Sequence, residues 1–331
     1  MKLIISLLLL FPVFSIPVSP QTPQDDDVIR VESDITNLFF VATDKDKRYI
    51  TTLRREDIRL REDGVAQQIL TFQHETDRPL SIAFLIDVSA SEERTLSLEK
   101  AAARTFIESV IRSNKDQAAI VPFTGAAFLE QPMTRDVLSI YRALERVDVA
   151  LPSYTGIGQP ISGIVSGPGT KAPPGEGSTA IWNAIALTAT QILAPSTGQR
   201  RRAIILLTDG FDTSSTVAMN TAINQALASE TIIYAIGIGD RRYEGVDEGV
   251  LRDLAERSGG RAFFPKKNAD LTAAFEAIQQ ELRSQYLLAF TSTNKQRDGK
   301  FRQLQIEISN PELIKQQLVL RYRPGYVAKP Y

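Results

Sequence analysis

Cysteine is absent from this sequence of 331 residues, and histidine occurs once. The lack of cysteine excludes disulfides, thiolate metal sites, thiol nucleophiles and a lipid-modified cysteine. The one histidine, His74, precedes the central part of the chain, so a Ser-His-Asp triad would have to recruit it from outside that region. We therefore expect no such triad, and we expect stability to come from core packing and, where one binds, from a metal ion.

Basic clusters are also missing. Lysine and arginine number 38 against 39 acidic residues, which gives a formal net charge of −1. No long block of Lys or Arg is available to neutralise a phosphate backbone or an anionic bilayer, so we expect neither nucleic acid nor a membrane surface as a partner. With 43% hydrophobic residues, the chain has the composition of a folded globular protein.

Phosphate-binding loops are lacking too. The sequence Gly237-Ile238-Gly239-Asp240 follows an apolar run but has no third glycine at the spacing of a dinucleotide loop. The segment around Lys171 contains glycine and Ser-Thr, yet never Gly-Lys followed directly by Ser or Thr. We therefore predict that the protein is not an enzyme, and metal-assisted hydrolysis is the one enzymatic alternative.

The N-terminus has the pattern of a secretory signal peptide. Lys2 is followed by the apolar run LIISLLLLFPVF and then by small residues ahead of the polar stretch QTPQDDD. A membrane anchor is the alternative, but Pro12 interrupts the run, which is shorter than the roughly 20 residues of a spanning helix. We predict a signal peptide over 1–20, a linker over 21–27, and export to the periplasm or the exterior. No second apolar span follows, so we expect no membrane insertion after cleavage.

The central part of the chain, 77–283, alternates apolar runs of strand length with stretches of helical period. The predicted strands are nearly continuous in apolar residues, which favours strands covered on both faces: 80–87, 117–124, 202–209, 231–239 and 261–265. The predicted helices place apolar residues three and four positions apart: 93–112, 135–147, 178–193, 217–229, 248–258 and 268–285. This alternation predicts an α/β domain, a doubly wound and mostly parallel sheet with helices on both faces.

The two flanks of this domain have a different pattern. Residues 28–76 and 284–328 contain short runs of alternating polarity, broken by turn signals such as Asp63-Gly64 and Asp298-Gly299. Each flank alone is too small to bury a good core. We predict that the two flanks pair into one small β-sandwich-like domain, with the α/β domain inserted between them.

Hydroxyl and carboxylate residues gather where predicted strands end. Asp87-Val88-Ser89-Ala90-Ser91 follows the first central strand, and Asp209 closes another. Thr179 opens a helix after a long segment, 151–177, that is rich in Gly, Pro and Ser. Ligands of open parallel sheets bind at the carboxyl ends of the strands, and hard cations such as Mg²⁺ prefer oxygen ligands. The Asp-x-Ser-x-Ser pattern supplies oxygen ligands of this kind at the end of a strand.

These residues resemble the von Willebrand factor A family, whose metal-ion-dependent adhesion site (MIDAS) is an Asp-x-Ser-x-Ser loop with a distant Thr and a distant Asp. The resemblance covers roughly residues 78–283 and includes AIGIGD and LRDLAERSGGRAFF near its end. The strand-rich flanks are similar to those of the von Willebrand factor A-related proteins of acidobacteria. The resemblance implies five residues that bind Mg²⁺, or Mn²⁺ or Ca²⁺, directly or through water: Asp87, Ser89, Ser91, Thr179 and Asp209.

Three further kinds of side chain near this motif have competing interpretations. Glu92 and Glu93 are expected to favour the positive start of the following helix, with tuning of the site or a second cation position as the alternative. Asp212 is expected to cap the following helix, although it could reach the site. Trp182 is expected to pack in the core.

The resemblance implies a function in binding. In the family, the ion accepts one more oxygen ligand, usually an acidic side chain of a partner protein. Our leading hypothesis is therefore an exported, adhesion-type module that binds a partner's carboxylate through its cation. The alternative is a scaffold domain of an envelope assembly, with metal-independent contacts through loop 151–177 and the β flanks.

Overall fold

A computed structural model of the chain describes these residues: 35–74, 78–89, 92, 94–149, 165–166, 178–196, 200–239 and 245–328. The predicted signal peptide and linker, nearly all of loop 151–177, and the side chains of Ser91 and Glu93 lie outside them. No helix among the described residues has both the length and the apolarity needed to cross a membrane.

The central domain is built on a sheet of six strands in the order β12-β11-β10-β5-β6-β8. Its first five strands run parallel, and β8 pairs antiparallel with β6 at one edge. The strands are β5 (Leu80–Asp87), β6 (Gln117–Phe123), β8 (Gln131–Thr134), β10 (Arg201–Thr208), β11 (Thr231–Gly237) and β12 (Ala262–Phe263). A further pair, β7 (Phe128–Leu129) and β9 (Val165–Ser166), lies outside this sheet.

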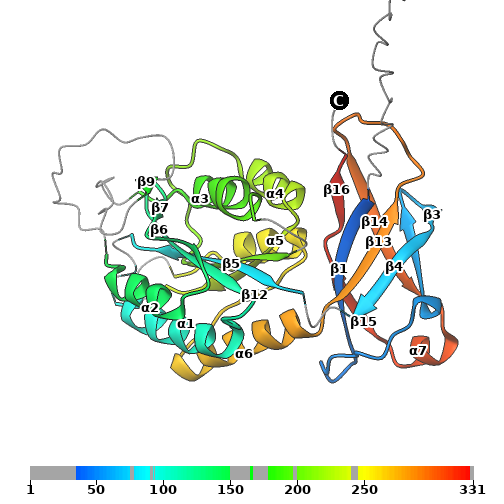
Figure 1. Ribbon diagram of the computed structural model, residues 1–331, viewed down its shortest axis with the longest axis horizontal. Helices are drawn as coiled ribbons and strands as arrows, with labels where there is room; N and C mark the ends of the chain where they lie inside the picture. Colours follow the sequence, from blue (N-terminus) through cyan, green and yellow to red (C-terminus); the bar gives the residue numbers. More distant parts are fainter. Residues whose placement is uncertain are drawn as a thin grey trace, which may run out of the picture. The chain divides into compact units, whose positions relative to one another are not determined.

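Helices cover both faces of this sheet (Figure 1). One face packs against α1 (Leu96–Val110), α2 (Val137–Arg146) and α6 (Asn268–Arg283). The other packs against α3 (Ile181–Leu187), which continues as a π-helical segment over Thr188–Leu193, and against α4 (Met219–Ala228) and α5 (Glu248–Ser258). Along β5, Phe84 joins the first core and Leu85 the second, because successive strand residues point to opposite faces. The predicted doubly wound α/β fold is confirmed.

The flanks form two antiparallel sheets of four strands each, in the orders β15-β1-β13-β4 and β16-β14-β2-β3. Both sheets combine strands from before and after the central domain. The strands are β1 (Ile35–Thr43), β2 (Ile58–Glu62), β3 (Val65–Gln67), β4 (Ile69–His74), β13 (Tyr286–Thr291), β14 (Phe301–Ile308), β15 (Val319–Tyr322) and β16 (Gly325–Val327). The short helices are a 3₁₀ turn, η1 (Arg55–Asp57), and α7 (Pro311–Lys315).

The two sheets share one core, which includes Phe40, Leu60, Tyr286 and Leu304. The central domain leaves this sandwich after β4 and returns at β13, and these two strands are neighbours, with His74 opposite Tyr286. The insertion therefore begins and ends at adjacent positions of one sheet. The sandwich-like arrangement that the sequence predicts is confirmed as part of the fold.

Candidate metal centre

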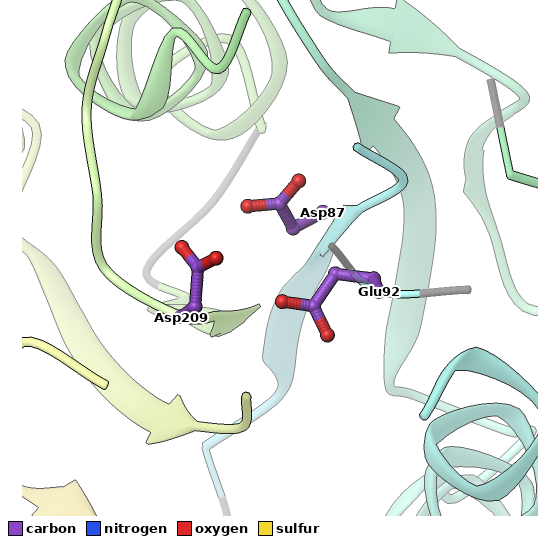
Figure 2. Close-up of side chains that lie close together, drawn as sticks. All are labelled: Asp87, Glu92 and Asp209. Atoms are coloured by element: carbon purple, nitrogen blue, oxygen red, sulfur yellow. The ribbon is translucent and has the colours of Figure 1, made fainter. Parts of the chain in front are cut away.

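Three carboxylates converge at the carboxyl edge of the central sheet (Figure 2). Asp87 is the last residue of β5, Asp209 directly follows β10, and Glu92 lies in the turn before α1. One oxygen from each carboxylate lies within 4.8 Å of the others. The strands β5 and β10 are parallel neighbours, so their carboxyl ends lie side by side and bring Asp87 and Asp209 together. In the sequence, Asp87 is 121 positions away from Thr208, the last residue of β10.

Asp87 is wholly buried and held by hydrogen bonds from Ser89 and Thr208. Its Oδ1 accepts from the backbone amide of Ser89 at 3.0 Å, and its Oδ2 accepts from the Thr208 hydroxyl at 2.6 Å. Burial raises the pKa of Asp87 to about 6, because desolvation outweighs the hydrogen bonds from Thr208 and from the side chain and amide of Ser89, and the charge of Asp209 adds to the effect of burial. Ser89 is itself buried beside Asp87, whereas Ser91 lies outside the described residues.

Asp209 is fixed by the turn that follows β10. Its Oδ1 accepts from the amide of Phe211 at 3.0 Å, and its carbonyl accepts from the amide of Asp247 at 2.9 Å. Gly210 adopts a left-handed conformation, with φ at +93°, and a Cβ there would lie 3.0 Å from the side chain of Leu251. Glycine at this position therefore allows the tight turn that presents the Asp209 carboxylate.

Thr179 is placed near this edge by backbone contacts. Its amide donates to the Thr213 hydroxyl at 2.8 Å, and its carbonyl accepts from the amide of Thr213 at 2.8 Å. The next amide, of Ala180, donates to the carbonyl of Thr124 at the end of β6. A Cβ at Gly125 would lie 2.6 Å from the Ser178 hydroxyl, so glycine permits this close approach. The segments after β6 and β10 thus hold Thr179, which is buried.

Glu92 lies ahead of the helix whose positive start it was expected to favour. The helix begins at Leu96, and the side chain of Glu92 is 0% exposed. The hydroxyl of Thr95 donates to its Oε2 at 2.6 Å, whereas its Oε1 is buried without a hydrogen-bond partner among the described residues. The amide of Glu92 donates to the carbonyl of Ser89, and its side chain lies in the interior. The position of Glu92 directly after the motif suggested a role in tuning the site or in a second cation position, but the sequence did not predict that its side chain is buried.

A fourth buried acid, Glu99, lies on α1 near Glu92. Burial raises the pKa of both glutamates, and the charge of Glu99 raises the pKa of Glu92 further. The effect is not mutual, because a hydrogen bond between the two carboxyls lowers the pKa of Glu99 while the charges of Asp87 and Asp209 raise it. The edge of the sheet thus gathers four buried carboxyl groups.

The other residues singled out in the sequence have structural contacts. Asp212 accepts from the hydroxyl of Ser215 at 2.6 Å and from the amide of Trp182 at 3.3 Å. It therefore caps α3 and not, as predicted, the helix that follows it in sequence; the loop after β10 folds back over the start of α3. Trp182 packs against the core as expected, and the ring of His74 lies against Tyr286 in the sandwich.

The donor set fits a hard divalent cation. Every side chain that converges here offers oxygen, and two of the carboxylates are already oriented by hydrogen bonds from Thr208 and Phe211. The unpartnered Oε1 of Glu92 is the kind of buried acceptor that a bound ion would satisfy.

Comparisons with known proteins place this geometry in a family. Two models, both described as the von Willebrand factor type A domain, match residues 170–281 and 82–211. A search of curated proteins gave no match.

Several solved structures are similar to the chain at low identity. Proximal thread matrix protein 1 from the mussel byssus, with a zinc-occupied MIDAS motif, is 17% identical at a TM-score of 0.50, covering 67% of this chain and 50% of that one. A von Willebrand factor type A protein from Catenulispora acidiphila is 15% identical at a TM-score of 0.49, covering 91% and 75%. An aerotolerance-related membrane protein from Bacteroides fragilis is 20% identical at a TM-score of 0.44, covering 61% and 98%.

Proposed function

The chain belongs to the von Willebrand factor type A family through residues 82–281, and from this premise we propose that it is an exported binding module that holds a divalent cation. Asp87 and Asp209 would bind the ion, with Ser89, Ser91 and Thr179 as hydroxyl ligands. We propose Mg²⁺, with Mn²⁺ or Ca²⁺ as alternatives, because all of these side chains offer oxygen. The observation that carries this proposal is the convergence of buried carboxylates at the carboxyl edge of the sheet.

The proposed mode of action is recognition and not catalysis. A cation held by two carboxylates and neutral hydroxyls is electrophilic, and it would accept one more oxygen from an acidic side chain of a partner protein. The zinc-occupied motif of proximal thread matrix protein 1 is a further reason to test metal binding here, and to include Zn²⁺. Export follows from the signal-like pattern of residues 1–20.

The test is calorimetric titration with Mg²⁺. Wild type should bind the ion, and Asp87→Asn should bind it much more weakly, because the amide replaces a charged ligand. Asp253→Asn is the matched control, since Asp253 is an exposed residue of α5 paired with Arg257. Equal binding by wild type and Asp87→Asn would refute the proposed site.

The mode of partner binding needs a second experiment. Capture of proteins from the native envelope should be lost when a chelator is added and restored by excess Mg²⁺. Capture that survives the chelator and the Asp87→Asn substitution would favour a scaffold that works without metal.

A further inference from the structure

Glu92 is held at the candidate metal centre by the backbone on both sides of it. Its amide donates to the carbonyl of Ser89 at 3.0 Å, and its carbonyl accepts from the amide of Thr95 at 3.0 Å. These two hydrogen bonds fix the backbone of Glu92 between β5 and α1, and its side chain is 0% exposed. Its carboxylate lies with those of Asp87 and Asp209 (Figure 2).

The two oxygens of Glu92 have different surroundings. Oε2 accepts the Thr95 hydroxyl at 2.6 Å, which fixes the orientation of the carboxylate. Oε1 is buried and has no hydrogen-bond partner among the described residues. A buried acceptor without a partner is costly, and native proteins rarely retain one unless a ligand or water satisfies it. Besides Thr95, the buried carboxyl of Glu99 is a hydrogen-bonding neighbour of Glu92. No hydroxyl or amide among the described residues donates to Oε1, so a cation could satisfy this oxygen, in a group whose other members are the proposed ligands.

We propose that Glu92 is a third carboxylate ligand of the cation and acts as an internal competitor of the partner's acidic side chain. This inference rests on the proposed function of the same site. A cation there would lie within reach of three carboxylates, since one oxygen of each is within 4.8 Å of the others. Glu92 lies outside the Asp-x-Ser-x-Ser motif, directly after its last serine.

The regulatory consequence follows from charge. Two aspartates balance the charge of a divalent ion, and a partner's carboxylate would then be the third anion at the site. With Glu92 bound, the third anion is already present, and a partner's carboxylate would bring a fourth into a buried region. Binding of the partner thus requires that Glu92 leave the ion. Glu92 tightens cation binding and weakens carboxylate binding.

The experiment uses Mn²⁺ as the probe, with binding followed by the loss of the free Mn²⁺ electron paramagnetic resonance signal. Glu92→Gln keeps the size of the side chain and an acceptor for Thr95, but it removes the charged ligand. Its Mn²⁺ affinity should fall by about tenfold or more. Glu99→Gln is the matched control, because Glu99 is also buried on this side of α1 but is not in the group of three. That variant should keep the wild-type affinity or exceed it.

Competition is measured with acetate at saturating Mn²⁺. Broadening of the acetate nuclear magnetic resonance line reports its access to the bound ion, and it should occur at a lower acetate concentration in Glu92→Gln than in wild type. Glu92→Asp adds a test of position, because it keeps the charge but shortens the side chain. If Glu92 binds the ion directly, the Mn²⁺ affinity of Glu92→Asp should fall below that of wild type. If only the charge of Glu92 matters, this variant should keep the wild-type affinity.

The outcomes separate this inference from the proposed function. If wild type binds Mn²⁺ and Asp87→Asn does not, while Glu92→Gln and Glu92→Asp match wild type, the site stands and the role of Glu92 is refuted. If wild type binds no Mn²⁺, both proposals are wrong. Weaker Mn²⁺ binding together with easier acetate access in Glu92→Gln supports the internal ligand.

Discussion

Thr208 donates a hydrogen bond of 2.6 Å to Oδ2 of Asp87. The two residues end the parallel strands β10 and β5, which pair up to Leu207 and Ile86. Both are fully buried, so this contact orients the Asp87 carboxylate from inside the sheet. Because Asp209 directly follows Thr208, one strand end supplies both a proposed ligand and the group that orients another.

Thr208→Val should weaken cation binding. The substitution keeps the shape of the side chain but removes the hydroxyl, and a hydrogen bond to a charged group contributes about 1.5–3 kcal/mol. We expect the Mg²⁺ affinity to fall by about tenfold in calorimetric titration. Thr208→Ser keeps the donor and should retain most of the affinity. Identical affinities for all three proteins would show that the hydrogen bond has no influence on the ion.

The stabilisation of the protein by Mg²⁺ should increase with pH. Burial raises the pKa of Asp87 from its ordinary 3.8 to about 6 in the ion-free protein. When the pKa of a group is higher in the folded state, the group contributes to folding stability at any pH below its unfolded-state pKa. This contribution is lost as the pH rises through the folded-state pKa. In chelator, the melting temperature should therefore fall over that interval.

Saturating Mg²⁺ should oppose this fall, because the ion binds the deprotonated carboxylate. Differential scanning calorimetry at several pH values from about 5 to about 8, with chelator or Mg²⁺, measures the difference. The increment due to Mg²⁺ should grow with pH in wild type and be nearly absent in Asp87→Asn. An increment that is constant across this range would contradict the assignment.

Asp116→Asn should destabilise the central domain by about 1–3 kcal/mol, because it removes the charged acceptor of hydrogen bonds from the amide of Leu80 and from Arg112, a side chain that is 32% exposed. Asp116 is 0% exposed; it accepts from the amide of Leu80 at 2.8 Å and from Nε of Arg112 at 2.7 Å. Chemical denaturation measures the change in the free energy of unfolding. The pair Arg257–Asp253 has the same spacing on an exposed helix, so Asp253→Asn should cost at most about 1 kcal/mol.

The stabilising effect of Asp116 should also disappear in acid. Burial opposes its ionisation, but the hydrogen bonds from Arg112 and from the backbone amides of Leu80 and Arg112 outweigh burial and hold the pKa of Asp116 below its ordinary 3.8. When the pKa of a group is lower in the folded state, the group contributes to folding stability at any pH above its unfolded-state pKa. This contribution is lost as the pH falls through the folded-state pKa. Wild type and Asp116→Asn should therefore converge in stability below that range. If wild type remained more stable than Asp116→Asn in strong acid, the ionised carboxylate of Asp116 could not be the source of the difference in stability.

Glu281→Gln should weaken the attachment of α6 to the sandwich. Glu281 is 1% exposed on α6 and forms an ion pair with Arg321 of β15. Loss of the charge leaves the Arg321 guanidinium, which is 26% exposed, without its counter-ion, at a cost of about 1–3 kcal/mol. A double-mutant cycle with Arg321→Gln, followed by chemical denaturation, measures the coupling. Additive effects of the two substitutions would show that the pair contributes no coupling energy.

Most of the fold could be predicted from the sequence. The strands of the central domain are short apolar runs between stretches of helical period, and both periods arise from local backbone geometry. The predicted helix over 248–258 is the observed α5, and the predicted strand over 80–87 is the observed β5. The first helix starts at Leu96 and not at residue 93, because the residues before it form turns.

For the candidate site, less could be predicted from the sequence than for the fold. By itself, the sequence determined that Asp87, Ser89 and Asp209 lie at strand ends, since a motif at the end of an apolar run is a local property. Only the tertiary structure decided that Thr208 orients Asp87, that Asp212 caps α3, and that Glu92 is buried beside two aspartates. Those relationships depend on strand order and on the path of two turns, which bring together residues whose spacing along the chain carries no signal of contact. Burial of Glu92 in particular is a property of the assembled edge, because a glutamate in a loop is otherwise expected in solvent.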